Sequence, residues 1–202
     1  MKTVNDFEKH YWSLDKLVIG IDEAGRGPLA GPLVVAGVVF PKDYISEEIY
    51  DSKQLTEKKR EQLYEVIVKD ALYYDVVIVE VETIEKLNIL EATRWGMSEI
   101  AKKANVDIVL TDALKLDIDK EVVDIVKGDQ KSISIAAASI VAKVTRDRIM
   151  YQMDEKYPQY NFKNNKGYPT KQHFKALDKY GITEIHRKNY KPVIEAMQSK
   201  LF

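Results

Sequence analysis

The chain has 202 residues, of which 45% are apolar and 31% charged, with no cysteine and a formal net charge of −1. This length suits one domain with a substantial hydrophobic core. The composition is that of a globular protein rather than a disordered or fibrous one. The lack of cysteine excludes a disulfide scaffold, thiolate catalysis and cysteine-bound zinc or iron–sulfur clusters. Any metal chemistry must therefore use oxygen ligands or the three histidines.

The sequence indicates a protein that neither spans a membrane nor is exported. No stretch approaches the roughly 20 apolar residues of a membrane-spanning helix. Residues 1–8 are charged and lack the apolar region of a signal peptide. We therefore expect a cytoplasmic protein with no membrane partner.

Charge is distributed unevenly along the chain. Residues 1–155 carry a net charge of −8, whereas residues 156–202 carry +7 and are rich in tyrosine and phenylalanine. Cations that meet phosphates, together with aromatic rings that stack on sugars or bases, are typical of a nucleic-acid surface. The alternative, which composition alone favours, is a solvated helical face with its aromatic residues in the core.

The first half of the chain predicts three strands and two helices. An apolar run over residues 17–21 predicts a buried central strand, and similar patterns predict strands over residues 33–40 and 73–81. Thr56 is a suitable N-cap for an amphipathic helix, and helical periodicity returns over residues 89–104.

The second half predicts short strands and a long helix. Residues 108–110 and 122–126 predict strands, and residues 135–153 predict a helix free of proline and glycine. The small residues in its first half allow close approach to a sheet. A polar loop over residues 161–170 precedes two further helices, near residues 171–179 and 192–200. This order is typical of an α/β fold with a mixed sheet covered by helices.

Acidic residues follow three of the predicted strands. Asp22 and Glu23 follow the first, Asp112 the fourth, and Asp129 comes shortly after the fifth. Because ligands collect at the carboxyl ends of strands in open sheets, we expect these side chains to converge. Carboxylates held together repel one another unless they bind a cation, and oxygen ligands favour Mg²⁺ or Mn²⁺. Two such ions can activate water against a phosphodiester. The alternative is that each acid is a helix cap or a surface residue.

A glycine-rich segment follows the first predicted strand. Residues 25–30 fit the G-x-G-x-x-A dinucleotide pattern, but Pro28, Gly31 and Pro32 prevent the helix that this fingerprint requires. Glycine N–H groups beside Arg26 can instead form a nest for a sugar–phosphate backbone. A simple tight turn is equally consistent with the pattern.

A phosphorylated receiver domain is a further alternative, since it also has an acidic pair after its first strand. Its phosphoacceptor aspartate would end the third strand, where this chain has Glu80-Val81-Glu82. No P-loop is present either, so the sequence does not support ATP-driven chemistry.

The segment IDEAGRGPLAGP, residues 21–32, resembles the first signature of ribonuclease HII, the type 2 ribonuclease H of bacteria. Further segments resemble motifs of this family in the family's order, namely residues 51–55, 88–93, 127–129, 134–147 and 167–170. The Gly-Arg-Gly wording and the lack of an extra N-terminal domain favour this class over ribonuclease HIII.

The resemblance implies a ribonuclease H-like fold, with a mixed five-stranded sheet flanked by helices. A catalytic domain is expected over residues 1–157, with a basic helical C-terminal extension over residues 158–202 packing on the same domain. The implied activity is hydrolysis of the RNA strand of RNA–DNA hybrids and cutting 5′ of single ribonucleotides in duplex DNA, leaving 5′-phosphate and 3′-hydroxyl ends. A non-catalytic binder of RNA–DNA junctions is the alternative. We expect a monomer.

The resemblance also assigns roles to individual residues. Two Mg²⁺ or Mn²⁺ ions would be held by four catalytic carboxylates, those of Asp22, Glu23, Asp112 and Asp129. The 2′-hydroxyl and the backbone at the junction would be contacted by Gly25, Arg26 and Gly27, and the neighbouring deoxyribose by Tyr168. This fits the chemistry, since only the 2′-hydroxyl distinguishes RNA from DNA at such a site. Phosphate contacts are expected from Lys53, Lys143 and Arg146, for which solvated surface charge is the alternative.

Two positions depart from the family's pattern. The family's Asp-Gly after the fourth strand is Asp112-Ala113 here, which matters if the glycine needs a positive φ. The family's His-Arg-x-Ser-Phe is here HRKNY, residues 186–190, in which Asn189 replaces a serine given a phosphate role. His173 and His186 are not spaced as metal ligands, and we expect His173 to cap or pack. The C-terminal residues 199–202 form no clear clamp-binding peptide.

Overall fold

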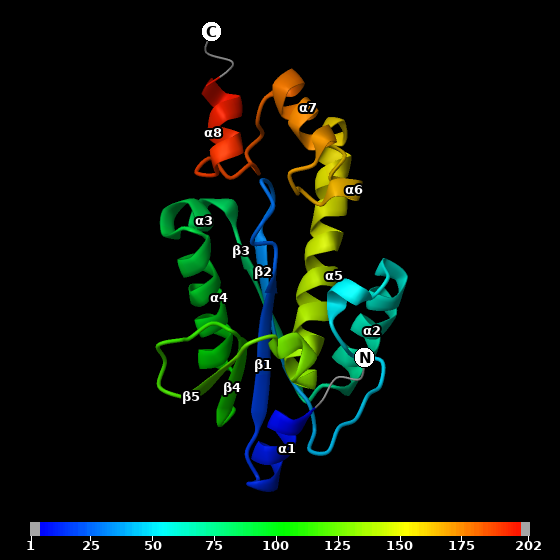
Figure 1. Cartoon of the computed structure of the whole chain (residues 1–202), viewed down its shortest axis with the longest axis vertical. Helices are drawn as coiled ribbons and strands as arrows, with labels where there is room; N and C mark the ends of the chain where they lie inside the picture. Colours follow the sequence, from blue (N-terminus) through cyan, green and yellow to red (C-terminus); the bar gives the residue numbers. More distant parts are fainter. Residues whose placement is uncertain (1–4, 199–202) are drawn as a thin grey trace.

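The computed structural model describes residues 5–198, and its centre is a five-stranded sheet (Figure 1). The strands are β1 (Val18–Ala24), β2 (Leu33–Val39), β3 (Tyr73–Val79), β4 (Ile108–Asp112) and β5 (Glu121–Ile125). They lie in the order β3-β2-β1-β4-β5, in which β1, β2 and β3 pair antiparallel and β1, β4 and β5 pair parallel. The predicted mixed sheet is confirmed. Its antiparallel half excludes a receiver domain, whose doubly wound sheet is parallel.

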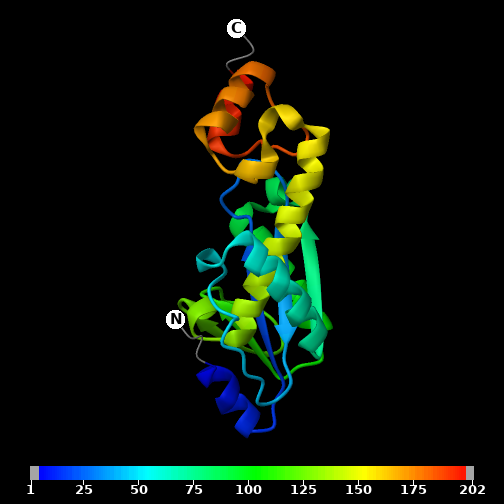
Figure 2. The same cartoon turned by 90° about the vertical axis from the view of Figure 1, so that its right-hand side faces the viewer.

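Helices cover both faces of this sheet and continue beyond one end of it. The helices are α1 (Asp6–Ser13), α2 (Glu57–Asp70), α3 (Val81–Leu87), α4 (Ile89–Lys103), α5 (Ile133–Lys156), α6 (Phe162–Asn165), α7 (Lys171–Tyr180) and α8 (Lys191–Gln198). Figure 1 shows α4 and α5 on opposite sides of the sheet, and Figure 2 shows α5 running from the sheet to the C-terminal helices. Within residues 5–198, no helix is both long and apolar enough to span a bilayer.

The central strands are buried on both faces, which explains their continuous apolar sequences. Val18 and Val34 belong to the core shared with α5, whereas Ile19 and Val35 face the core shared with α4. Gly20 lets α5 approach β1 closely, because a Cβ at this position would overlap the backbone of Ser134. The alanines at the start of α5 are fully buried in the same core, so the predicted packing against the sheet is confirmed.

The first turn of α5 is held by side chains from two parts of the chain. The Ser132 hydroxyl accepts a hydrogen bond from the Ile135 amide as the N-cap. Buried Glu8, from α1, accepts hydrogen bonds from the Ser134 amide and the Ser132 hydroxyl. Burial raises the pKa of Glu8. Helix α1 therefore fixes the start of α5, directly after the segment that carries Asp129.

Three short α-helices were not predicted. Residues 6–13 form α1, and the loop expected over residues 161–170 contains α6. The third strand ends at Val79, two residues earlier than expected, and Val81 begins α3 instead. Val81 is β-branched and buried, so its side chain alone does not distinguish a strand end from a helix start. The last two residues of the helix expected over 192–200 lie outside the described residues.

The C-terminal extension packs on the segment that follows β1. The amide of Leu29 donates to the Gly167 carbonyl, that of Gly31 to the Ile185 carbonyl and that of Arg187 to the Leu29 carbonyl, each at 2.8 Å. A separate small apolar cluster joins the two parts and contains Leu29, Ala30, Met150, Tyr160, Phe162, Leu177 and Val193. The extension therefore determines the shape of residues 25–32.

Candidate active site

An open cleft of about 270 Å³ lies where β1 and β4 end. Its walls combine acidic, basic, glycine and aromatic residues, including Asp22, Glu23, Asp112, Gly25, Arg26, Gly27, Lys53, Arg60, Lys143 and Tyr168. Most of the predicted site residues therefore come together in one place. Asp129 lies beside the cleft wall, and Arg146 lies behind it.

Three of the predicted carboxylates line the cleft from two neighbouring strands. Asp22 and Glu23 are consecutive at the end of β1, and Asp112 ends β4. Burial raises the pKa of Asp22 well above its usual value, and the charges of Glu23 and Asp112 raise it further. Burial also raises the pKa of Glu23, to which the charge of Asp112 adds, although nearby Arg26 opposes the shift. The local field therefore disfavours further negative charge and favours a cation.

The fourth carboxylate is held next to the other three. Asp129 is buried in the short 3₁₀ helix η2 (Gly128–Gln130), and the Gly128 amide donates to Oδ1 of Asp112 at 2.9 Å. Burial raises the pKa of Asp129, and Asp112 is among the charges that add to this shift. Lys53, exposed in the 3₁₀ helix η1 (Ser52–Gln54), opposes the shift, with Nζ 3.6 Å from Oδ2 of Asp129.

The chemistry of this donor set fits a hard divalent cation, because it consists of carboxylate oxygens that repel one another, with Asp22 and Asp129 buried. Among residues 5–198, however, no three acidic or histidine side chains converge at metal-ligand spacing. Two cationic side chains neutralise part of the charge instead. Nη1 of Arg26 lies 3.5 Å from Glu23, and Lys53 pairs with Asp129. Binding of a metal ion at a shared centre would require Glu23 and Asp129 to turn from Arg26 and Lys53.

Comparison with known proteins identifies the family. The family model described as Ribonuclease HII matches residues 19–193. The chain is also 54% identical over 194 residues to a Ribonuclease HII of Clostridioides difficile (strain 630), with 94% of this chain and 76% of that protein covered. The chain belongs to the ribonuclease HII family. It is therefore a type 2 ribonuclease H, an endoribonuclease.

Solved structures of this family share the fold. The ribonuclease H2 of Pyrococcus horikoshii OT3 matches with a TM-score of 0.77 at 26% identity, covering 91% of this chain and 98% of that one. The ribonuclease HII of Archaeoglobus fulgidus, solved in a complex with PCNA, matches with a TM-score of 0.76 at 29% identity, covering 87% and 95%. The predicted ribonuclease H-like fold is thereby confirmed.

The Gly-Arg-Gly segment of this ribonuclease HII lies at the mouth of the cleft, beside Tyr168. Gly25 has a φ of 106°, a conformation that L side chains rarely adopt. Arg26 and Gly27 are exposed. A Cβ on Gly27 would lie 3.5 Å from the ring of Tyr168, so the two residues are neighbours. The Tyr168 carbonyl is 3.0 Å from Nδ1 of His173, which ties this tyrosine to α7 within the C-terminal extension.

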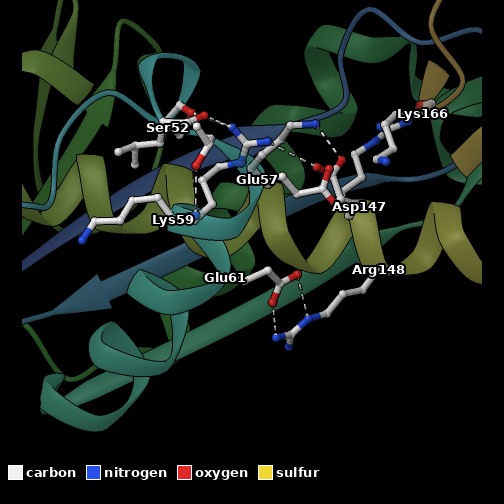
Figure 3. A network of polar contacts seen from close by, with 12 residues as sticks. Ser52, Glu57, Lys59, Glu61, Asp147, Arg148 and Lys166 are labelled. Carbon is white, nitrogen blue, oxygen red and sulfur yellow. Dashed lines mark hydrogen bonds and ion pairs between the residues drawn. The ribbon is translucent and has the colours of Figure 1, made fainter. Parts of the chain in front are cut away.

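Lys143 lines the cleft and is held from within α5. Its Nζ lies 2.6 Å from Oδ1 of buried Asp147, and burial lowers the pKa of Lys143. Asp147 also lies 3.9 Å from Nη2 of Arg60, a further cation of the cleft that comes from α2. In the surrounding network, Figure 3 shows Arg148 of α5 paired with Glu61 of α2. Asp147 thus positions two cations at one wall of the cleft.

Arg146 occupies a different position from the one expected. Its side chain is 1% exposed, and it donates to the carbonyls of Ala30, Pro32 and Lys166 at 3.0 to 3.1 Å. A guanidinium buried among backbone carbonyls does not reach a substrate phosphate. The structure therefore corrects the expectation that Arg146 meets a phosphate and shows that it stabilises the segment after β1.

Sequence reasoning missed Arg60, Asp147 and Arg187 in and around the site. The spacing of Asp147, four residues after Lys143 on a helix, was a signal for this ion pair. Nothing in the sequence placed Arg60 at the cleft. His173 is buried, so its expected packing role is confirmed, and His186 is buried beside it. Ala113 has a φ of 51°, the positive value that the family's glycine suggested.

Proposed function

We propose that this ribonuclease HII cuts the RNA strand of RNA–DNA hybrids and nicks duplex DNA on the 5′ side of a single ribonucleotide, leaving 5′-phosphate and 3′-hydroxyl ends. The observation that carries the proposal is the cleft itself, in which strand-end carboxylates face the exposed Gly-Arg-Gly segment and Tyr168. We further propose that the protein acts as a cytoplasmic monomer.

Four residues of the chain, Asp22, Glu23, Asp112 and Asp129, would hold two Mg²⁺ or Mn²⁺ ions. Such ions, when bound, supply an activated water and neutralise the charge that develops on the phosphate and the leaving oxygen. The raised pKa values of Asp22, Glu23 and Asp129 support this role, because a nearby cation offsets both the burial and the mutual repulsion that raise them. The amides of Gly128 and Glu23 orient Asp112 and Asp22 before substrate arrives.

The remaining residues of the cleft would bind and orient the nucleic acid. The Gly-Arg-Gly segment offers backbone amides to the 2′-hydroxyl, and Tyr168 offers a 40% exposed ring to the next sugar. Lys53 and Lys143 would neutralise phosphates on either side of the scissile bond. The exposed cations of this basic segment, among them Lys163, Lys171 and Lys175, support attraction of a duplex to this end of the molecule.

A labelled DNA duplex with one ribonucleotide tests the proposal. We expect a nick that requires Mg²⁺ or Mn²⁺ and leaves the ribonucleotide at a new 5′ end, while an all-DNA duplex stays intact. Asp112→Asn and Asp129→Asn should nearly abolish the nick. Asp124→Asn is the matched control, because Asp124 is an exposed acid on the neighbouring strand β5. Binding without a product in either metal would refute the proposed reaction and support a non-catalytic junction binder.

A further inference from the structure

Arg187 lies between α7 and α8, and its side chain is fully buried against the segment after β1. Its Nε donates to the Gly31 carbonyl at 3.1 Å, and Nη2 donates to the carbonyls of Gly31 and Gly25 at 2.9 and 2.6 Å. Its Nη1 donates to the Arg26 carbonyl at 3.1 Å and to the Tyr190 hydroxyl at 3.0 Å. A guanidinium has five N–H donors, so every one of them is used.

The charge of Arg187 is stabilised by backbone carbonyl groups and one hydroxyl group, with no carboxylate partner among the described residues. Within the described part of the chain, no carboxylate lies within 4.0 Å of its guanidinium, and burial lowers its pKa. Burying an unpaired charge destabilises a protein unless hydrogen bonds compensate fully. Its partners are all the backbone of residues 25–31 and one tyrosine. Arg187 is thus committed to the conformation of that segment.

Tyr190 completes the arrangement through its hydroxyl group. The hydroxyl accepts from Nη1 of Arg187 and donates to the Arg26 carbonyl at 2.8 Å. The Arg26 carbonyl thus accepts two hydrogen bonds, one from each residue. Without this hydroxyl the Arg26 carbonyl would keep only the hydrogen bond from Arg187.

These contacts fix the directions of two backbone amides. In a trans peptide the carbonyl of one residue and the N–H of the next point in opposite directions, and the described residues contain no cis peptide. Because the carbonyls of Gly25 and Arg26 point towards Arg187, the amides of Arg26 and Gly27 point away from it, at the exposed mouth of the cleft. Neither of these amides donates to an acceptor within residues 5–198.

The opposite side of Gly25 is blocked by Arg146. A Cβ on Gly25 would overlap the Arg146 side chain and approach the Pro32 carbonyl within 2.9 Å. Gly25 is therefore enclosed between two buried guanidinium groups, and the peptide that follows it cannot rotate without breaking contacts on one side. The amides of Arg26 and Gly27 are held ready before substrate binds.

We propose that Arg187 and Tyr190 are positioning residues that set the sugar selectivity of this enzyme, by holding the amides of Arg26 and Gly27 towards the 2′-oxygen of the ribonucleotide. This inference rests on the proposed function, because it requires that the Gly-Arg-Gly segment contacts the 2′-hydroxyl. It adds that residues which do not touch the substrate determine the orientation of the donors that do.

Two duplexes test the inference, one with a single ribonucleotide and one with a single 2′-deoxy-2′-fluoro nucleotide at the same place. Fluorine is a poor hydrogen-bond acceptor, so the fluoro duplex does not benefit from oriented amides. We expect Tyr190→Phe to lower kcat/KM for the ribonucleotide duplex about three- to tenfold, the range for one lost hydrogen bond. The inhibition constant of the fluoro duplex as a competitor should not change. Arg187→Lys, which keeps the charge but loses the fork, should give a larger fall of the same kind.

Tyr180→Phe is the matched control, since Tyr180 lies exposed on α7 and should affect neither duplex. Equal weakening towards both duplexes by folded Tyr190→Phe, or no change towards either, would overturn the inference. If Arg187→Lys does not fold, Tyr190→Phe alone decides. NMR shifts of the Arg26 and Gly27 amides in the free protein should also change in Tyr190→Phe, independently of activity. Failure of the wild-type protein to cut at a ribonucleotide would instead refute the proposed function.

Discussion

Nε2 of His173 lies 3.0 Å from Nε2 of His186, and both imidazoles are fully buried. The Thr183 amide donates to Nδ1 of His186 at 2.9 Å, so the proton of His186 is on Nε2 and is donated to His173. The proton of His173 is then on Nδ1 and is donated to the Tyr168 carbonyl. Two neutral rings therefore form a chain of hydrogen bonds that ends at a residue of the cleft.

This pair predicts a loss of stability in acid. Burial lowers the pKa of His186 to about 4, from a usual value of 6.5, and also lowers the pKa of His173. The unfolded chain then binds more protons than the folded one, so the contribution to stability is present above pH 6.5 and is lost as the pH falls towards 4. The expected slope is about 1.4 kcal/mol per pH unit for each proton. It can be measured by urea unfolding between pH 4 and 7.

Replacing one member of the pair should reduce this dependence. His186→Gln is expected to give a shallower slope than the wild type, even if its stability at pH 7 is lower. His10→Gln is the control, because His10 is exposed on α1 and outside this cluster. Parallel slopes for the wild type and His186→Gln would contradict the assignment.

Asp22→Asn should stabilise the metal-free protein while it abolishes cleavage. The pKa of Asp22 is raised by burial and by neighbouring acids, so its ionised form disfavours the fold at pH 7. An amide at this position removes that repulsion, and we expect the free energy of unfolding at pH 7 to rise. The gain should shrink at lower pH, where the wild-type carboxyl binds a proton.

Thermal unfolding with a chelator at pH 7 and pH 5 measures this effect. Adding Mn²⁺ should raise the melting temperature of the wild type, because a ligand of the folded state stabilises it, and should raise that of Asp22→Asn much less. Asp124→Asn should respond to Mn²⁺ as the wild type does. An equal response of Asp22→Asn would show that Asp22 does not contribute to metal binding.

The prediction of the fold from the sequence succeeded where one physical signal dominates. The apolar run that ends at Asp22 predicted a strand buried on both faces, and that prediction also placed the acids at the sheet edge. The signal is weaker where a residue's partners are distant in sequence. The polar segment HRKNY has the composition of a solvated loop, yet Arg187 within it is fully buried. The carbonyls that accept its hydrogen bonds lie 156 to 162 positions earlier in the chain. Local patterns carry no information on such contacts.

The basic composition of the C-terminal part illustrates the same limit. Its positive charge favoured a nucleic-acid surface, but charge counts do not separate exposed from buried cations. Lys166 is 8% exposed and Arg187 is fully buried, so neither adds to a surface for phosphates. Likewise Arg146 and Lys143, three residues apart on α5, have different environments. Their sequence positions alone predicted the same role for both.

These two α5 cations should separate cleanly by mutation. Arg146→Gln leaves buried carbonyls without donors, and we expect a loss of about 3 kcal/mol in the free energy of unfolding. Lys143→Gln keeps a donor for Asp147 and should change stability little. It should instead weaken duplex binding and lower the salt dependence of log Kd by about one unit, as for one phosphate contact. Urea unfolding and binding titrations at several salt concentrations measure the two effects. A large loss of stability in Lys143→Gln with an unchanged salt slope would assign it a purely structural role.

Ala113→Gly should stabilise the protein. Ala113 is exposed with a φ of 51°, and this left-handed conformation costs an L residue about 1 kcal/mol relative to glycine. We expect a gain of that size in urea unfolding, with cleavage maintained. Ala71→Gly is the matched control, since Ala71 has a φ of −66° and glycine there should lose about 0.5 to 1 kcal/mol. A destabilised Ala113→Gly would show that another interaction compensates the strain.

The carbonyl of Arg26 accepts its hydrogen bonds from residues 161 and 164 positions later in the chain. Two proteins with an identical Gly-Arg-Gly signature can thus differ in how firmly its peptide planes are held. Substitutions near the C-terminus can change the backbone at the cleft while the Gly-Arg-Gly sequence itself remains unchanged. A scaffold that receives the Gly-Arg-Gly sequence without Arg187 and Tyr190 would gain the three residues but not their backbone geometry.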